Sequence, residues 1–145
     1  MEKSMAALTR YVGCKKAFAG HGMAFEPERQ YEPALFSMSE GYQAMGRLLD
    51  RMPELTAVFA MSDVMAVGAI RAIQDHGLRV PQDIAVAGYD GIALGRYTVP
   101  RLTTIRQNTT VLAERAADIL LRCIEENAPA RHETVPFELV EGESI

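Results

Sequence analysis

Two short apolar runs, each followed by an aspartate, enclose a single helical pattern near the middle of the chain. Residues 57–61 precede Asp63, and residues 84–88 precede Asp90. This order of strand, helix and strand predicts a β-α-β unit, whose two strands run parallel. In open parallel sheets, ligands bind outside the carboxyl ends of the strands. We therefore expect Ser62, Asp63 and Asp90 to share one rim that binds a small molecule.

Strand and helix patterns alternate before this unit as well. A helical pattern covers residues 2–20, and residues 29–36 form a weak strand pattern because Pro33 lacks an N–H donor. Ser37 and Glu40 have the spacing of a capping box, which predicts a helix that begins after Ser37. No strand pattern precedes the first helix, so we expect a sheet that lacks its first strand.

The alternation continues to the end of the chain. Residues 102–106 predict an extended segment, and Thr109 or Thr110 is expected to cap an amphipathic helix. Residues 134–140 alternate in polarity and predict a last strand. The whole pattern predicts an α/β fold, as an incomplete doubly wound lobe with a parallel sheet.

Composition limits the choice of partner. The 145 residues fit one domain, or one lobe and part of another, and 48% of them are hydrophobic. The formal net charge is −4, and the 15 lysines and arginines are scattered along the chain. Since nucleic-acid binding needs a clustered basic face, we do not expect these residues to wrap nucleic acid by themselves.

Catalytic and metal-binding patterns are absent from the sequence. Cys14 and Cys123 lie far apart and the three histidines are dispersed, so we expect two reduced thiols, no metal, no cofactor and no catalytic residue. No apolar run approaches membrane-spanning length, and no secretory signal opens the chain. If Met1 is the natural start, these features indicate a cytoplasmic protein without a membrane partner.

The residues of the expected rim allow two interpretations. Asp90 can accept hydrogen bonds from ligand hydroxyls or cap the turn that follows it, and position alone leaves both open. Ser62 and Asp63 favour structural roles, as the N-cap of a helix and as a carboxylate at its positive end. From the residues alone, Arg10 is interpreted as a solvated helical arginine and Phe36 as a core ring.

Longer segments carry a more specific signal. Residues 62–73, 77–90 and 100–107 read S-D-V-M-A-V-G-A-I-R-A-I, G-L-R-V-P-Q-D-I-A-V-A-G-Y-D and P-R-L-T-T-I-R-Q. Together they closely resemble the effector-binding core of LacI/GalR-type transcriptional regulators. The segments R-Y-V-G, F-S-M-S-E-G-Y and the closing V-P-F-E-L-V-E-G-E-S-I are similar to other parts of that core. The resemblance covers nearly the whole chain.

This resemblance implies roles for individual residues. Arg10, in R-x-x-G, would hydrogen-bond to ligand oxygens, and Phe36 would stack on a ligand ring. Ser62 and Asp90 would reach ligand hydroxyls. Tyr97 would lie near the interface of a homodimer.

Three positions depart from the family pattern. Ser62 replaces a more frequent Asn, Gly91 stands where a second Asp is common, and Cys14 stands where an aromatic ring is usual. The Ser62 hydroxyl has a shorter reach than an amide and fewer hydrogen-bonding groups. These departures leave the identity of the ligand open.

The resemblance also implies a division of the chain. Residues 1–98 and 130–145 would form the C-terminal lobe of a type I periplasmic-binding-protein-like domain, without its first strand. Residues 99–129 would cross into the N-terminal lobe and supply a helix to it. A DNA-binding domain is absent, so operator DNA would be bound only through an N-terminal domain outside these residues.

The sequence therefore predicts the effector-binding and dimerisation portion of a regulator that responds to a sugar or a nucleoside-like molecule. The alternative is a periplasmic sugar-binding protein of an ABC transporter, which shares the fold and is compatible with Gly91 after G-Y-D. The segment P-R-L-T-T-I-R-Q favours the regulator. Because strand edges would be unpaired, we also expect the chain to be marginally stable or to self-associate.

Overall fold

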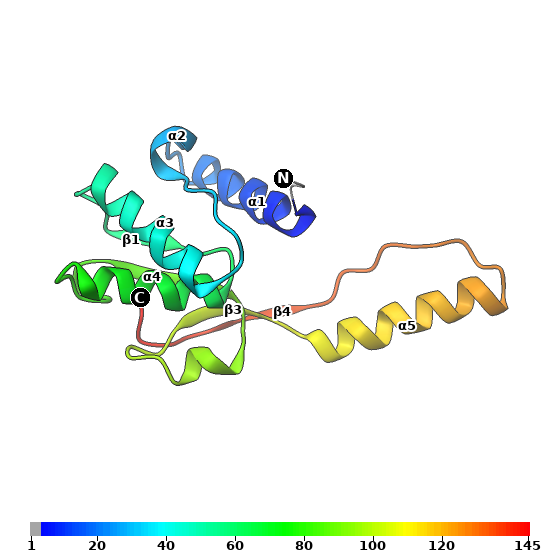
Figure 1. Cartoon of the computed structure of the whole chain (residues 1–145). Coiled ribbons are helices and arrows are strands. Elements are labelled where there is room, and N and C mark those ends of the chain that lie inside the picture. The colour runs from blue at the N-terminus through cyan, green and yellow to red at the C-terminus, as the bar shows by residue number, and fades with distance from the viewer. Residues whose placement is uncertain (1–3) are drawn as a thin grey trace.

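A mostly parallel sheet with two packed helices forms the body of the protein. The computed structural model describes residues 4–145. Its elements are α1 (Met5–Gly20), α2 (Pro27–Gln30), α3 (Met38–Arg51), β1 (Ala57–Phe59), α4 (Asp63–Asp75), β2 (Ala85–Asp90), the 3-10 helix η1 (Ala93–Arg96), β3 (Thr103–Gln107), α5 (Thr109–Glu125) and β4 (Phe137–Val140). Figure 1 shows the body with α1 beside it and α5 extending away from it.

The four strands among the described residues form one sheet in the order β1-β2-β3-β4. The pairs β1–β2 and β2–β3 are parallel, whereas β4 runs antiparallel to β3. In this register Ala57 faces Ala85, and Asp90 faces Arg106. The predicted β-α-β unit is confirmed, and so is the open, mostly parallel α/β fold class.

The core lies between the sheet and the helices α3 and α4. Its buried side chains come mainly from α4 and include Ala66, Ile70 and Ile73. Val86 of β2 is fully buried beneath them. The hydrophobic effect of these side chains holds α4 on the sheet.

Two glycines allow α3 to approach α4 closely. A Cβ atom on Gly41 would lie 2.6 Å from the Cα atom of Met65, and one on Gly68 would lie 2.8 Å from the backbone nitrogen of Tyr42. Real Cβ atoms do not approach other heavy atoms this closely. The two helices can therefore pack this closely only because glycine has no side chain at these two positions.

The predicted helix caps are largely present. Ser37 accepts a hydrogen bond from the Glu40 N–H, and Ser62 accepts one from the Met65 N–H. The prediction for α5 is wrong by one residue, because the Asn108 side chain, not Thr109 or Thr110, accepts the capping bond from Val111. Asn shares with Thr the short oxygen-bearing side chain that a cap requires.

Two other sequence expectations differ from the structure, and part of a third lies outside the described residues. No strand forms in residues 29–36, because residues 29 and 30 belong to α2 and residues 31–36 have no neighbouring strand to pair with. The last strand is shorter than residues 134–140 and begins at Phe137, where pairing with β3 begins. The first two positions of the expected opening helix lie outside the described residues.

The end of the chain is anchored in the sheet. Ser144 is fully buried, and its hydroxyl donates to the Val86 carbonyl at 2.6 Å and accepts from the Thr103 N–H at 2.8 Å. The Val86 N–H in turn donates to the Ser144 carbonyl at 2.7 Å. One serine therefore joins β2 to the residue that begins β3.

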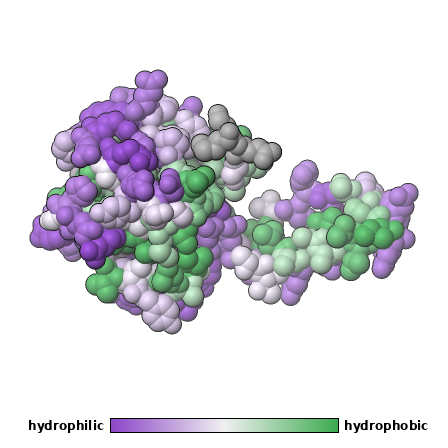
Figure 2. All heavy atoms as spheres, in the orientation of Figure 1, coloured by the Kyte–Doolittle hydropathy of each residue, from purple (hydrophilic) through white to green (hydrophobic). Residues whose placement is uncertain are grey.

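Helix α5 has no packing partner in the described part of the chain. None of its residues is buried, and Leu120 and Ile124 are 60% and 68% exposed. Figure 2 shows apolar side chains along this protruding helix. The chain leaves the sheet at Gln107 and returns at Phe137, and these two residues are paired in the ladder.

Candidate functional site

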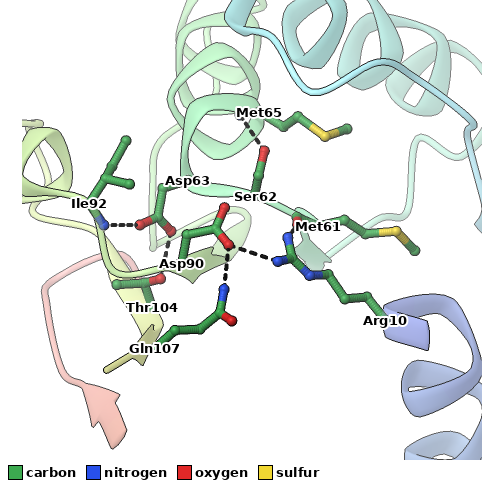
Figure 3. Close-up of polar contacts among 9 residues, drawn as sticks. All are labelled: Arg10, Met61, Ser62, Asp63, Met65, Asp90, Ile92, Thr104 and Gln107. Carbon is green, nitrogen blue, oxygen red and sulfur yellow. Dashed lines mark hydrogen bonds and ion pairs between the residues drawn. The ribbon is translucent and has the colours of Figure 1, made fainter. Parts of the chain in front are cut away.

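The carboxyl ends of the three parallel strands meet at one edge of the sheet. Met61 and Ser62 follow β1, Asp90 ends β2, and Gln107 ends β3. Arg10 reaches this edge from α1 (Figure 3). Ser62, Asp63 and Asp90 therefore lie at the carboxyl ends of neighbouring strands, as expected, but Ser62 and Asp63 are buried and only Asp90 is partly exposed. The binding of a small molecule at this edge remains a prediction.

An ion pair lies at the centre of this edge. The Arg10 Nη2 atom lies 2.8 Å from the Asp90 Oδ1 atom, and the Arg10 guanidinium also donates to the Met61 carbonyl. The Gln107 Nε2 group donates to the same Asp90 oxygen at 2.9 Å. The side chains of Arg10 and Asp90 are 14% and 30% exposed, so solvent and a ligand can reach Asp90.

The second carboxylate oxygen of Asp90 is available for a ligand. Both contacts to this side chain end on Oδ1, and Figure 3 shows the other oxygen without a contact to the residues drawn. A carboxylate oxygen accepts hydrogen bonds and does not donate them when ionised. The site can therefore bind a hydroxyl or an N–H group at this position.

The backbone at Asp90 adopts a strained conformation. Asp90 has a φ of 113° and Gly91 a φ of 73°. For a residue with a side chain, such a conformation costs on the order of 1–3 kcal/mol and is found mostly at functional sites. A Cβ atom on Gly91 would lie 2.5 Å from the Arg106 Cβ atom, which explains why glycine and not a second aspartate fits here.

Two aromatic rings surround the Arg10 guanidinium. Its central carbon lies 4.0 Å from the centre of the Tyr89 ring and 5.6 Å from the centre of the Phe36 ring. Rings at these distances attract a cation through their negative faces. Phe36 is 40% exposed, so its ring is not part of the core and can contact a ligand.

Asp63 connects α4 to the loop beyond β2 and to β3. It is fully buried, and it accepts hydrogen bonds from the Thr104 hydroxyl at 2.5 Å and from the Ile92 N–H at 2.8 Å. Burial raises the pKa of this carboxyl above its ordinary value, although its hydrogen bonds act in the opposite direction. The interpretation of Asp63 as a simple helix-end carboxylate is incomplete, because the side chain also holds the segment that follows Asp90.

Ser62 caps α4. It is 2% exposed, and its hydroxyl accepts from the Met65 N–H at 3.4 Å. In Figure 3 this hydroxyl points toward α4. A contact between Ser62 and a ligand remains a prediction.

Tyr97 lies apart from this site, directly after η1. It is 81% exposed, and the nearby Val99 is 84% exposed. Exposed apolar side chains mark an interaction surface only where they form a larger patch. The role of Tyr97 in a dimer remains a prediction.

Sequence reasoning missed two residues of the site, Gln107 and Tyr89. Gln107 ends the third parallel strand, so the rule that predicted Asp90 could also have indicated Gln107. Tyr89 precedes Asp90 in the sequence, and alternation along a strand would place its ring on the opposite face. Asp90 and the Tyr89 ring nevertheless both contact the Arg10 guanidinium, and Asp90 has a φ of 113° that no pattern in the sequence indicates.

No group of three or more metal-binding side chains occurs within residues 4–145. None of the helices in this range is long and apolar enough to cross a membrane.

A family model described as a periplasmic binding protein-like domain matches residues 4–145. The chain therefore belongs to the periplasmic binding protein-like family. Its relatives are LacI-type repressors, which confirms the resemblance inferred from the sequence.

Curated relatives are similar over most of this chain. The transcriptional repressor PurR of Histophilus somni (strain 129Pt) is 40% identical over 147 residues, which cover 99% of this chain and 43% of the repressor. PurR of Pasteurella multocida (strain Pm70) is 42% identical over 86% of this chain and 37% of the repressor. The transcriptional regulator MalR of Clostridium butyricum is 34% identical, over 93% of this chain and 40% of the regulator. The chain thus spans about two fifths of the length of these relatives.

Solved structures give the same result. A complex of the transcriptional regulator CelR with cellobiose has a TM-score of 0.92 at 31% identity, over 99% of this chain and 44% of that one. A lac repressor dimer bound to operator and the anti-inducer ONPF has a TM-score of 0.85 at 30% identity, over 96% of this chain and 41% of that one. These comparisons do not favour the alternative of a transporter's sugar-binding protein.

Proposed function

We propose that this chain is the effector-binding and dimerisation portion of a LacI/GalR-type transcriptional regulator. The effector is a small molecule with hydroxyl groups, either a sugar or a nucleoside-like compound. The chain binds and does not catalyse. It acts in the cytoplasm as part of a homodimer, and operator DNA is bound by residues outside these 145.

The convergence of Arg10, Asp90 and Gln107 beside the Phe36 ring carries this proposal. Asp90 offers an oxygen that has no partner among the residues of Figure 3, and Arg10 offers N–H groups. Phe36 offers an exposed aromatic face. A few placed polar groups beside an aromatic surface are typical of small-molecule sites. The names of the relatives support a regulatory role.

In this proposal the effector competes for groups that already bind each other. Arg10 and Asp90 form an ion pair, so an effector must either bridge them or use their remaining atoms. Phe36 stacks on the effector ring, and Ser62 supports the edge through its cap of α4. Tyr97 contributes to the dimer interface together with Val99.

The test is a binding panel of monosaccharides, disaccharides and nucleosides, measured with this chain by ligand-observed NMR and calorimetry. One class is expected to bind, and Asp90→Ala is expected to weaken that binding by about tenfold or more, because a hydrogen bond to a charged group contributes about 1.5–3 kcal/mol. Asp75→Ala is the matched control, since Asp75 is a surface carboxylate on α4 paired with Arg71. It should leave the affinity unchanged.

Two results would overturn the proposal. The first is that no member of the panel binds. The second is that Asp90→Ala and Asp75→Ala have equal effects. Sedimentation of Tyr97→Ser tests the dimer separately, and an unchanged dimer fraction would remove Tyr97 from the interface.

A further inference from the structure

Asp63 is an ionisable residue at a position where a charge is costly. It is 0% exposed, and within residues 4–145 it takes part in no ion pair. Burial disfavours the charged form of a carboxyl group, and no cation offsets that cost here. An apolar side chain of similar size would avoid the cost altogether. The position of Asp63 therefore points to a task that an apolar side chain cannot perform.

The two carboxylate oxygens of Asp63 bind in two directions. Oδ1 accepts from the Thr104 hydroxyl at 2.5 Å, and Oδ2 accepts from the Ile92 N–H at 2.8 Å (Figure 3). Thr104 belongs to β3, whereas Ile92 lies in the loop that follows β2. An ionised carboxylate accepts at both oxygens, so it can hold a strand and a loop at the same time.

A glycine in β2 makes room for this carboxylate. A Cβ atom on Gly88 would overlap the Asp63 Oδ1 atom and would lie 2.9 Å from the Leu102 Cδ2 atom. Gly88 lies two residues before Asp90 in the same strand. The Asp63 carboxylate therefore rests directly against the backbone of the strand that carries Asp90.

The turn that Asp63 holds has an unusual backbone. Asp90 and Gly91 have φ values of 113° and 73°, and Ile92 returns to −70°. A residue with a side chain keeps a positive φ only where its surroundings enforce it. Gly91 packs against Arg106 on one side, and the bond from Ile92 to Asp63 holds the other end of the turn.

The two ends of this bond differ in their surroundings. Asp63 is the first residue of α4, and the preceding Ser62 caps that helix by accepting from the Met65 N–H. The buried face of α4 packs in the core. Asp90, in contrast, is partly exposed at the edge of the sheet. Asp63 is therefore the anchored end of the bond, and the turn after Asp90 is the end that it holds.

We propose that Asp63 is a positioning residue for effector binding. Its bond to the Ile92 N–H holds the turn after β2, and the turn keeps Asp90 in the conformation that pairs with Arg10 and leaves Oδ2 of Asp90 for an effector. This inference rests on the proposed function. Without the bond, Asp90 would hold this conformation for only part of the time, and the apparent affinity would fall by that fraction.

The first measurement needs no ligand. In NMR spectra, the three-bond coupling between the amide and α protons of Asp90 reports its φ, and it is small at 113° and large in an ordinary extended strand. Asp63→Ala is expected to raise this coupling, because the backbone relaxes once the Ile92 N–H is released. Asp63→Leu keeps the branched shape without an acceptor, and it tests the same point if the alanine variant does not fold.

Two further variants separate positioning from general stability. Asp63→Asn keeps an oxygen for the Ile92 N–H, and its NH₂ group can donate to the Thr104 hydroxyl, which also accepts. It should therefore keep the Asp90 coupling. Thr104→Val is the matched control, because it removes the other partner of Asp63 and leaves the bond to the turn. It should lower the free energy of unfolding without changing the Asp90 coupling.

The second measurement is affinity, determined by calorimetry with cellobiose and adenosine as the probes, one from each effector class. Asp63→Ala should weaken the probe that binds by about tenfold, and Asp63→Asn should restore most of that loss. Because Asp63 acts through Asp90, the two effects should not add. In an Asp90→Ala background, Asp63→Ala should change the affinity little further.

Two outcomes would overturn the positioning role. One is an Asp90 coupling that is the same in Asp63→Ala, or in Asp63→Leu, as in the unchanged chain. The other is a loss of affinity of the same factor with and without Asp90, which would show that Asp63 does not act through that residue. Binding of neither probe would count against the proposed function, while the Asp90 coupling would still decide whether Asp63 positions the turn.

Discussion

Helices α4 and α5 begin in the same way and have opposite surroundings. Each has a side chain that caps its first turn, Ser62 for α4 and Asn108 for α5. Eight residues of α4 are buried, and none of α5 is. An amphipathic pattern therefore predicts that a helix forms and which face is apolar, but it does not predict that its partner is present.

The largest expected effect is a matched pair of truncations, one in each helix. Ile73 of α4 is fully buried and Ile124 of α5 is 68% exposed. Ile73→Ala should lower the free energy of unfolding by about 4 kcal/mol, because it leaves a cavity in a packed core. Ile124→Ala should change it by less than about 0.5 kcal/mol, as for an ordinary surface position.

Urea titration followed by circular dichroism measures both variants. If Ile124→Ala also costs more than 1–2 kcal/mol, a typical cost for losing packing, α5 has a packing partner in solution, for example in a self-associated form. The dependence of that cost on protein concentration would then identify self-association. The statement that α5, unlike α4, lacks a packing partner would then be wrong for the chain in solution.

The second effect tests how closely α3 and α4 approach. Gly68→Ala should destabilise the protein by about 3 kcal/mol, because its Cβ would overlap the backbone of α3. Gly46→Ala is the matched control on α3, since the nearest atom to its Cβ would be the His76 Cε1 at 4.0 Å. It should stabilise the protein by about 0.5–1 kcal/mol, the usual gain of alanine over glycine in a helix. Similar melting curves for the two variants would contradict the close packing.

The third effect concerns the buried carboxylate of α4. Burial raises the pKa of Asp63 above its ordinary value of 3.8. The folded state therefore holds this proton more tightly than the unfolded state, so the stability contribution of Asp63 is complete below pH 3.8 and declines as pH rises through the folded-state pKa. Asp63→Asn should remove this decline and cost about 2 kcal/mol at low pH, because one acceptor is lost.

Thr104→Val sharpens the same test. It removes the hydroxyl that donates to Asp63 and helps to lower its pKa. The decline in stability should therefore move to higher pH than in the unchanged chain. If the unfolding free energy of Thr104→Val depends on pH in the same way as that of the unchanged chain, the Thr104 hydroxyl does not affect the pKa of Asp63.

The smallest expected effect concerns Asp83, which lies in the turn between α4 and β2. Asp83 accepts hydrogen bonds from the Arg79 side chain and N–H, and these lower its pKa from 3.8 to about 2. Its contribution is present above pH 3.8 and is lost as pH falls toward about 2. Asp83→Asn should flatten the acid limb of the stability curve in that window. A limb of unchanged slope would show that the exposed pair contributes nothing.

Local patterns explain why much of the fold could be predicted. The spacing of Ser37 and Glu40 and the helical pattern between the two apolar runs both reflect interactions between near neighbours in the sequence. They predicted α3, α4 and the β-α-β unit. The position of Asp90 followed from the general rule for parallel sheets.

The structural features that the sequence did not predict depend on contacts between residues far apart in the chain. Residues 29–36 have the composition of a weak strand, but a strand also needs a neighbouring strand to pair with, and the sequence of this segment does not show whether one is present. Asp63 could be interpreted only as a helix-end residue until Thr104 was known to lie beside it. Arg10 and Phe36 acquired their expected roles from the family resemblance, because nothing in their own surroundings in the sequence distinguishes them.

The pairing of Gln107 with Phe137 has a mechanical consequence. The whole excursion that contains α5 leaves and re-enters the sheet at this single rung, and the Arg106–Glu138 ion pair at 2.8 Å secures the next one. Residues 108–136, which include α5, are therefore joined to the sheet at both ends through one rung of the ladder. Gln107 at this rung also donates a hydrogen bond to Asp90, so the residue at one end of this excursion contacts the carboxylate at the sheet edge.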